Sequence, residues 1–401
     1  MDVGSLTEGG WKTQVKEKIA ILAVAFLLLV GIDRTNLSNP ASNETAPSTT
    51  ATNHHVLTHP KRRRRIVRKR RRRVVHHWSP WDVSSIGDPS AGDDPAGEDP
   101  VAREAALKAI GNWNGSVVVV NPNNGRIVSI VDQKLALNSG YIPCSTIKPM
   151  VALGGLREDI VTLQTKLPSM RGGRITMKDA LAHSDNLYFA TLGNMLGFKR
   201  VTHYAEELGY GQLAGWHIPG ESPGVFPSAP PSQSQGGVGL LTSFGQDIEV
   251  TPLQMAALIS AIANGGTLYY LQYPRSLEQI RNFHPIVKRR LTDLAPFIPE
   301  VKPGLEAAVM YGTARSAFNP DEQIFGKTGT CSENRARMGW FVSFAEGQPN
   351  YVVVVTLRGG RPMFGPHAAE IAGIFYRDML QIGQPGQQAR RLPALLSRPG
   401  Q

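Results

Sequence analysis

The chain has 401 residues, of which 41% are hydrophobic and only two are cysteines. This length and composition can support a sizeable folded core, and they exclude a scaffold that depends on many disulfides. The net charge of +11 comes from one tract, residues 61–73, which holds 11 lysines and arginines; the other 32 basic residues balance 32 acidic ones. The chain is therefore a near-neutral body with one basic segment.

The N-terminus has the pattern of a membrane anchor. Lys12, Lys16 and Lys18 precede an apolar run of fourteen residues, 19–32. As a helix this run spans roughly 21 Å, short of the ~30 Å hydrocarbon core, which is typical of a signal-peptide core or a short anchor. Because no clean small-x-small cleavage site follows, we favour an uncleaved signal-anchor over a cleaved signal or a buried helix. The lysines then predict a cytoplasmic segment 1–18 and a single-pass protein of the cytoplasmic membrane, with its catalytic part on the periplasmic side.

Residues 33–100 are rich in Asn, Ser, Thr, Pro and charged residues and have no periodic apolar face. This composition predicts a disordered linker. The basic tract 61–73 lacks a nucleic-acid-binding fold motif, so we expect anionic lipid or an envelope polymer as its partner, and no nucleic acid.

The folded body is predicted to span 101–384, followed by a tail at 385–401. Runs of β-branched residues at 116–120 and 126–131 flank Asn124-Gly125 and predict a β-hairpin. Helices are expected over 102–110, from Ser145 onward, and over 177–192, 199–208, 250–263 and 368–380, and strands over 323–330, 338–345 and 351–357. A hairpin first, helices in the middle and a meander last predict an α+β fold with an antiparallel sheet.

One Ser-x-x-Lys pattern, Ser145 to Lys148, opens an apolar run with helical spacing. A serine nucleophile needs a base within hydrogen-bond reach, and residues three apart on a helix share a face. To act as that base, Lys148 must be neutral, which burial and a second nearby cation both promote. The pattern alone also fits a capped helix with an exposed lysine.

Two further motifs follow in order, Ser184-Asp185-Asn186 and Lys327-Thr328-Gly329-Thr330. A second Ser-x-Asn, Ser332-Glu333-Asn334, directly follows Lys-Thr-Gly, where it cannot form an independent wall of a cleft, so we treat it as coincidental. The ordered set of three motifs resembles that of the penicillin-binding proteins and serine β-lactamases.

The resemblance extends over residues 112–382, including the hairpin at 115–130, the stretch Val250-Thr251-Pro252-Leu253-Gln254 and Gly339-Trp340-Phe341. It is closest in character to the class B penicillin-binding transpeptidase domains. It implies an antiparallel sheet flanked by helices with an all-helical subdomain. It also implies a peptidoglycan D,D-transpeptidase or D,D-carboxypeptidase of the cell wall, with stem peptides as substrates, β-lactams as covalent inhibitors, and no metal or organic cofactor.

The resemblance assigns catalytic roles to four residues. Ser145 would attack the carbonyl between the two terminal D-alanines of a stem peptide and form an acyl-enzyme. Lys148 would take the proton of Ser145. Ser184 would relay a proton to the leaving amine, assisted by Lys327, whose charge would also keep Lys148 deprotonated.

The resemblance also assigns substrate-binding roles. The Asn186 side chain would hold the substrate backbone, and the strand segment with Thr328, Gly329 and Thr330 would bind the substrate carboxylate through its hydroxyls. Backbone N–H groups of Ser145 and Thr330 would form an oxyanion hole.

The two cysteines lie beside these motifs: Cys144 precedes the nucleophile, and Cys331 lies four residues after Lys327. The resemblance implies a disulfide between them, because class A carbapenemases join the equivalent two positions. The penicillin-binding proteins usually have glycine before the serine. An exported domain would keep such a bond oxidised. Two buried free thiols are the alternative.

Three other functions remain open at this stage. A class A β-lactamase needs a Glu-x-x-Leu-Asn loop, and neither Glu206-Glu207-Leu208-Gly209 nor Pro219-Gly220-Glu221 carries it. Class D enzymes favour Ser-x-Val over Ser-x-Asn. A non-catalytic sensor that β-lactams merely acylate is disfavoured by the intact motifs, and transpeptidase and carboxypeptidase differ only in the acyl acceptor.

Overall fold

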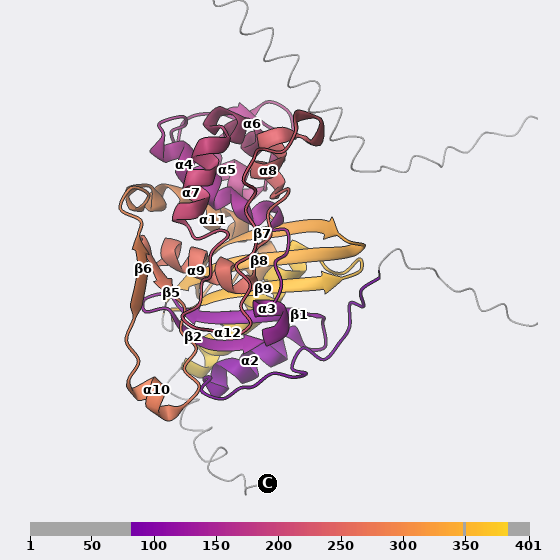
Figure 1. The fold of residues 1–401 in the computed structure, drawn as a ribbon. Coiled ribbons are helices and arrows are strands. Elements are labelled where there is room, and N and C mark those ends of the chain that lie inside the picture. Colours follow the sequence, from indigo (N-terminus) through magenta and orange to yellow (C-terminus); the bar gives the residue numbers. More distant parts are fainter. Residues whose placement is uncertain (1–81, 348–349, 384–401) are drawn as a thin grey trace, which may run out of the picture. The chain divides into compact units, whose positions relative to one another are not determined.

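The computed structural model describes residues 82–347 and 350–383, which belong to one compact unit of the chain, Ser79–Gln401 (Figure 1). None of the helices in these two ranges is long and apolar enough to cross a membrane. The predicted segments that lie outside the described residues are the N-terminus 1–18, the anchor 19–32, the basic tract 61–73 and the tail 385–401.

A five-stranded antiparallel sheet forms the centre of this unit, with the strand order β2-β1-β9-β8-β7. Its strands are β1 Gly115–Asn121, β2 Arg126–Val131, β7 Gln323–Glu333, β8 Ala336–Glu346 and β9 Val352–Gly359. The predicted hairpin of β1 and β2 turns through Gly125, whose φ of 74° suits glycine. Pairing of β1 with β9 joins this hairpin to the C-terminal meander. The predicted α+β class and antiparallel sheet are confirmed.

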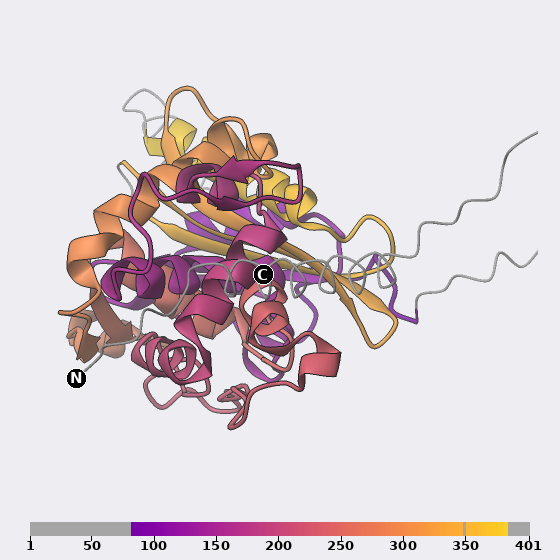
Figure 2. The ribbon, with the colours of Figure 1, turned by 90° about the horizontal axis from the view of Figure 1, so that it is seen from above.

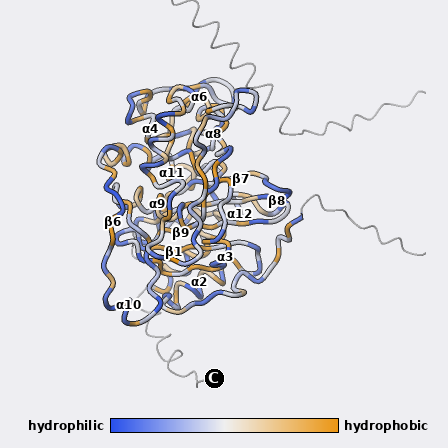
Figure 3. Tube along the Cα trace, in the orientation of Figure 1, coloured by the Kyte–Doolittle hydropathy of each residue, from blue (hydrophilic) through white to orange (hydrophobic). Residues whose placement is uncertain are grey.

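Helices cover both faces of the sheet, so its strands contribute to two hydrophobic cores. Successive side chains of a strand alternate between faces: Val118 and Val120 enter one core, and Val117 and Val119 enter the other. Helices α2 Pro100–Ile110 and α12 Gly365–Gly383 pack on one face, and α9 Pro252–Ala263 packs on the other (Figure 2). Burial on both faces explains why β1 and β9 are nearly continuous apolar runs, visible as the hydrophobic centre of Figure 3.

A group of helices lies beyond the β7 edge of the sheet (Figure 1). Its members are α4 Lys148–Arg157, α5 Met177–Ala182, α6 Asn186–Leu196, α7 Phe198–Glu207, α8 Gly237–Phe244 and α11 Ile298–Met310. Helix α11 packs against both α5 and β7, so it connects this group to the sheet. This group is the all-helical subdomain that the resemblance implied.

Two predicted helices differ from the structure at the motifs. The helix expected over 177–192 is interrupted at Ser184, whose φ of 57° is left-handed and cannot continue a helix. The carboxylate of Asp185 then caps α6. Ser145 lies in a 3₁₀ turn, η1 Cys144–Ile147, and α4 begins only after it. Apolar spacing does not reveal such breaks, because it continues through them.

Several elements were not predicted. They are α3 Gln133–Leu137, α8, α10 Leu277–Arg281, α11, the strand pairs β3 Leu167–Pro168 with β4 Arg174–Ile175 and β5 Thr267–Tyr270 with β6 Ile286–Arg290, and the 3₁₀ turns η2 Gln233–Gln235, η3 Ala295–Phe297 and η4 Arg315–Ala317. Helix α11 was missed because Pro303 lies in its interior, where proline is usually excluded.

The linker predicted over 33–100 extends too far. Within residues 82–99, the carboxylates of Asp93 and Glu98 form ion pairs of 2.8 Å and 3.0 Å with Arg103 of α2, and all three side chains are largely buried. Asp99 caps the same helix. A buried arginine requires such partners. Their composition is typical of a linker, and composition alone does not show that Asp93 and Glu98 pair with Arg103.

Candidate active site

The three motifs meet where the β7 edge of the sheet faces the helical subdomain. Ser145 comes from η1, Lys148 begins α4, Ser184 and Asn186 flank the start of α6, and Lys327 lies on β7. The side chain of Lys148 connects the first motif to the second, and a disulfide connects the first to the third. Within the described ranges, no cluster of three or more His, Cys, Asp or Glu side chains could hold a metal ion.

Lys148 is fully buried and lies at the centre of this site. Its Nζ lies 3.0 Å from Ser145 Oγ and 3.1 Å from Ser184 Oγ, and it donates to the Ser184 carbonyl at 2.8 Å and to Asn186 Oδ1 at 2.6 Å. These last two oxygens can only accept. A neutral amine therefore spends its two N–H groups on them and keeps its lone pair for a serine hydroxyl.

The surroundings of Lys148 favour the neutral amine. Burial lowers the pKa of Lys148 well below 10.5, and the positive charge of Lys327 lowers that pKa further. The carboxylate of Asp185 acts in the opposite direction, because it favours the ammonium. Desolvation is the largest of these effects, as expected for a side chain with no exposure. The geometry thus gives Ser145 a base within hydrogen-bond reach.

Lys327 is the second buried lysine of the site. Its Nζ donates to the Thr328 carbonyl at 2.8 Å, and burial lowers the pKa of Lys327 to about 7. In the part of the chain that the structure describes, no hydrogen bond joins Lys327 to Ser184. Any assistance that Lys327 gives to Ser184 in this conformation therefore acts through charge.

Both threonines of the Lys-Thr-Gly-Thr strand have fixed partners. Thr328 Oγ1 lies 2.6 Å from Thr313 Oγ1, and Thr330 Oγ1 accepts a hydrogen bond of 2.8 Å from the Gly365 N–H at the start of α12. Because the Thr330 oxygen accepts from Gly365, its own proton remains available to donate to a carboxylate.

Sequence reasoning assigned no role to Thr313 or Gly365. The Thr313 N–H also donates to the Ala182 carbonyl at 3.0 Å, so this residue links the turn before the second motif to the third. Nothing in the sequence related Thr313 to Thr328, 15 residues away. Only the packing of α11 on β7 brings the two hydroxyls together.

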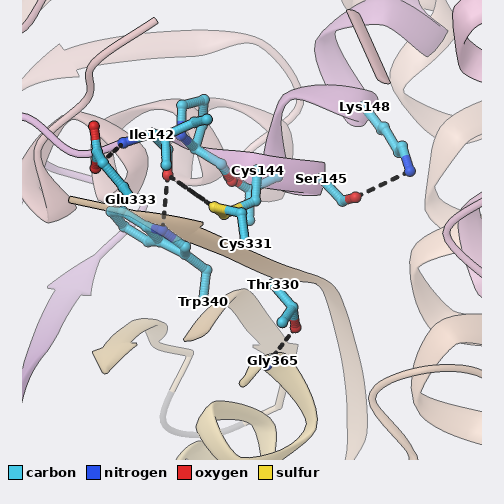
Figure 4. Close-up of a disulfide and its surroundings, with 11 residues drawn as sticks. Ile142, Cys144, Ser145, Lys148, Thr330, Cys331, Glu333, Trp340 and Gly365 are labelled. Carbon is cyan, nitrogen blue, oxygen red and sulfur yellow. Dashed lines mark hydrogen bonds between the residues drawn. A yellow bond between two sulfur atoms is a disulfide. The ribbon is translucent and has the colours of Figure 1, made fainter. Parts of the chain in front are cut away.

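A disulfide joins Cys144 to Cys331, with their Cα atoms 5.7 Å apart (Figure 4). The structure thus has the pairing that the resemblance to class A carbapenemases implied. Cys144 has a φ of 52°, a conformation in which glycine is the usual residue. This conformation explains why a glycine commonly occupies the position in penicillin-binding proteins.

The disulfide also fixes a close approach between the nucleophile turn and β7. A Cβ atom on Gly329 would lie 3.0 Å from the Pro143 carbonyl and 3.2 Å from Cys144 Cβ, so a larger residue would push the two segments apart. The bond flanks the backbone N–H groups of Ser145 and Thr330. Their spacing is therefore held covalently.

The residues before the nucleophile are held from the sheet side (Figure 4). The Trp340 indole donates to the Ile142 carbonyl at 3.1 Å, and the Glu333 carboxylate accepts from the Ile142 N–H at 3.4 Å. Ser332-Glu333-Asn334 forms the end of β7 and the start of its hairpin turn, where Asn334 has a φ of 46°. The second Ser-x-Asn is therefore part of a hairpin, and its Glu333 supports the first motif.

Comparison with known proteins decides the family. The family model described as "Penicillin binding protein transpeptidase domain" matches residues 115–380, more than half of the chain. The chain belongs to the penicillin-binding protein transpeptidase family. This domain contains all three motifs and both cysteines.

Among its relatives, Stage V sporulation protein D of Bacillus subtilis is 29% identical over 66% of this chain and 48% of its own length. Peptidoglycan D,D-transpeptidase MrdA of Acinetobacter baumannii is 26% identical over 67% of this chain and 51% of its own length. The chain thus spans about half the length of these relatives. Among solved structures, the transpeptidase domain of Burkholderia pseudomallei penicillin-binding protein 3 superposes with a TM-score of 0.61 at 20% identity, covering 72% of this chain and 96% of that one. This likeness shows the fold.

Proposed function

We propose that this protein is a peptidoglycan D,D-transpeptidase that works through an acyl-enzyme on Ser145. Lys148 takes the hydroxyl proton as Ser145 Oγ attacks the carbonyl between the two terminal D-alanines. The amide C–N bond then breaks, the terminal D-alanine leaves with a proton delivered through Ser184, and the donor peptide remains as an ester. The amine of a second stem peptide attacks this ester, forms the new amide and releases Ser145 Oγ, which regains its proton.

Other residues stabilise and orient this chemistry. The backbone N–H groups of Ser145 and Thr330 bind the oxyanion, and loss of one such donor typically costs on the order of 100- to 1000-fold in rate. The hydroxyls of Thr328 and Thr330 and the charge of Lys327 bind the terminal carboxylate. Asn186 uses its amide N–H₂ on the substrate backbone, because Lys148 occupies its oxygen.

The observation that carries this proposal is the fully buried Lys148 amine 3.0 Å from Ser145 Oγ. The experiment is incubation with a synthetic stem peptide ending in D-Ala-D-Ala, with and without an amine acceptor, followed by mass spectrometry. We expect a cross-linked product only with the acceptor present. Release of D-alanine to water alone would indicate a carboxypeptidase. Turnover by Ser145→Ala equal to the wild type would contradict the proposal.

Glu207 and Glu221, two of the glutamates that could have served a β-lactamase, have structural partners. Glu221 accepts hydrogen bonds from the Ala214 and Gly215 N–H groups, and Glu207 lies 3.9 Å from Arg289. These contacts support slow hydrolysis of a penicillin adduct, as expected for a transpeptidase. Rapid hydrolysis of penicillin would favour the β-lactamase.

We propose the cellular arrangement from the sequence. Residues 19–32 anchor the chain in the cytoplasmic membrane, 1–18 remain cytoplasmic, and the catalytic domain faces the peptidoglycan outside, with 61–73 near an anionic surface. Three lysines before the apolar run support this orientation. A reporter fused after residue 100 should be active only if the reporter works outside the cytoplasm, and activity of a strictly cytoplasmic reporter there would contradict it.

A further inference from the structure

A cavity of about 660 Å³ lies near the edge of the sheet opposite to the active site. Its walls come from α3, from the loop at 216–219 and from the segment 272–283, which includes α10. The Ile127 N–H of β2 donates to the Gln272 carbonyl, so the cavity adjoins the β2 edge, whereas the active site lies at the β7 edge. In Figure 1, α10 lies at the end of the molecule away from the helical subdomain.

The aromatic part of this cavity is an exposed indole. Trp216 is 43% exposed although it is one of the largest apolar side chains of the domain. Its ring meets Tyr270 and His217 edge-on, with centroids 5.2 Å and 4.6 Å away, and its backbone N–H donates to the Leu271 carbonyl at 2.8 Å. These contacts orient the indole and leave ring surface available to a ligand.

The polar part of the cavity has unused hydrogen-bonding capacity. Among the described residues, the side chains of His217, Glu278 and Asn282 have no hydrogen-bond partner, although they line the cavity together with the indole. Gln272 donates its amide to the His284 carbonyl, and its oxygen has no donor within the same residues. The lining therefore offers both donors and acceptors to a ligand that has many hydroxyl or amide groups.

The charge of the lining argues against an anionic ligand. Arg275 is the only arginine or lysine of the lining, and it is paired with Asp94 and stacked over the Tyr273 ring at 4.3 Å. Glu278 adds a negative charge and forms no ion pair in the described structure. Phosphate, nucleic acid and acidic lipid are thus disfavoured, and a neutral, hydroxyl-rich ligand is favoured.

We propose that this cavity binds the glycan strand of peptidoglycan; this inference rests on the proposed function. A pyranose ring has an apolar C–H face that packs on an indole, and hydroxyl and acetamido groups that pair with amide, imidazole and carboxylate side chains. The volume lies within the range of pockets that hold small organic ligands. The cavity would hold the polymer while its peptide is processed at Ser145.

The two sites are far enough apart to be tested separately. Four strand spacings separate β7 from β2, which places the edges about 19 Å apart. A change at Trp216 should therefore leave acylation by penicillin unaltered, because penicillin carries no sugar. It should weaken only the binding of glycan and the turnover of glycan-linked peptides.

The test uses the purified protein and two neutral probes, glycan strands whose lactyl carboxylates are amidated and an N-acetylglucosamine tetramer, with a maltose oligomer as the control sugar. Tryptophan fluorescence and calorimetry measure binding to the wild type, Trp216→Ala, Glu278→Gln and Phe318→Ala, the last being an exposed aromatic elsewhere. We expect saturable binding of the two probes, weakened about tenfold or more by Trp216→Ala and less by Glu278→Gln, and unchanged in Phe318→Ala.

Two outcomes would overturn the inference: no saturable binding of either probe to the wild type, or equal binding to the wild type and Trp216→Ala. Binding of maltose oligomers with the same affinity would also overturn it. Fluorescent penicillin labelling of the same samples separates this inference from the proposed function. Labelling of Ser145 without glycan binding refutes only the glycan site, and glycan binding without labelling refutes only the transpeptidase.

Discussion

Reduction of the Cys144–Cys331 disulfide should destabilise the domain and disable its active site. The two cysteines are 187 residues apart in the sequence, and the chain-entropy treatment of a loop of this length gives about 5 kcal/mol of stabilisation. The free energy of unfolding should fall by up to this amount in reductant. The acylation rate should fall too, because the bond spaces the backbone N–H groups of Ser145 and Thr330.

Paired variants separate the bond from its side chains. The double variant Cys144→Gly with Cys331→Ala removes both thiols, and glycine accepts the left-handed conformation at 144. Its stability should match that of the reduced wild type or slightly exceed it, and reductant should not change it. Cys144→Ala with Cys331→Ala should be less stable by about 1 kcal/mol, because alanine is strained at this φ.

Urea denaturation and fluorescent penicillin labelling, each with and without reductant, are the two assays. Equal unfolding free energies for the oxidised and reduced wild type would refute the stability argument. An unchanged labelling rate in the reduced protein would refute the link to the oxyanion hole. Two free thiols in denatured, unreduced protein from an oxidising compartment would refute the disulfide itself.

Three further predictions concern the site. The rate of penicillin acylation should rise with pH as Lys148, whose pKa is lowered, loses its proton, and it should fall above about pH 7, where Lys327 loses its charge. In Lys327→Arg the rate should no longer fall at high pH. A fall that persists in this variant would contradict the assignment to Lys327. Thr313→Val should slow acylation about fivefold, because Thr328 loses a hydrogen bond worth on the order of 1 kcal/mol. Thr313→Ser should keep the wild-type rate, and equal rates for the two variants would refute the role of the hydroxyl pair. Trp340→Phe should lower the free energy of unfolding in urea by about 1 kcal/mol, because the partly buried Ile142 carbonyl loses its donor, and an unchanged value would show that the bond is dispensable.

The sequence was sufficient to predict the motifs, the hairpin and the sheet class, because each depends on short-range chemistry. Ser145 and Lys148 are three residues apart, and Asn124-Gly125 has the φ preferences of a tight turn. The order of the motifs, matched to a known family, then provided the long-range arrangement that spacing alone does not contain.

The remaining features depend on contacts between distant segments. Ser184 has a left-handed backbone conformation and interrupts a helix although the apolar spacing continues through it. Arg103 forms an ion pair with Asp93, which lies in a segment with the composition of a linker. Thr313 meets Thr328 only because α11 packs on β7. Such contacts are set by tertiary packing, which neither propensity nor composition encodes.

The most direct test of the central claim is to locate the covalent adduct with penicillin. The protein is incubated with a fluorescent penicillin, digested, and analysed by tandem mass spectrometry, alongside Ser145→Ala, Lys148→Ala and Ser184→Ala. The position of Lys148 Nζ beside Ser145 Oγ predicts one long-lived adduct on Ser145. This adduct should be absent from Ser145→Ala and should form far more slowly in Lys148→Ala. An adduct that persists in Ser145→Ala, or one that maps to Ser184 in the wild type, would contradict it.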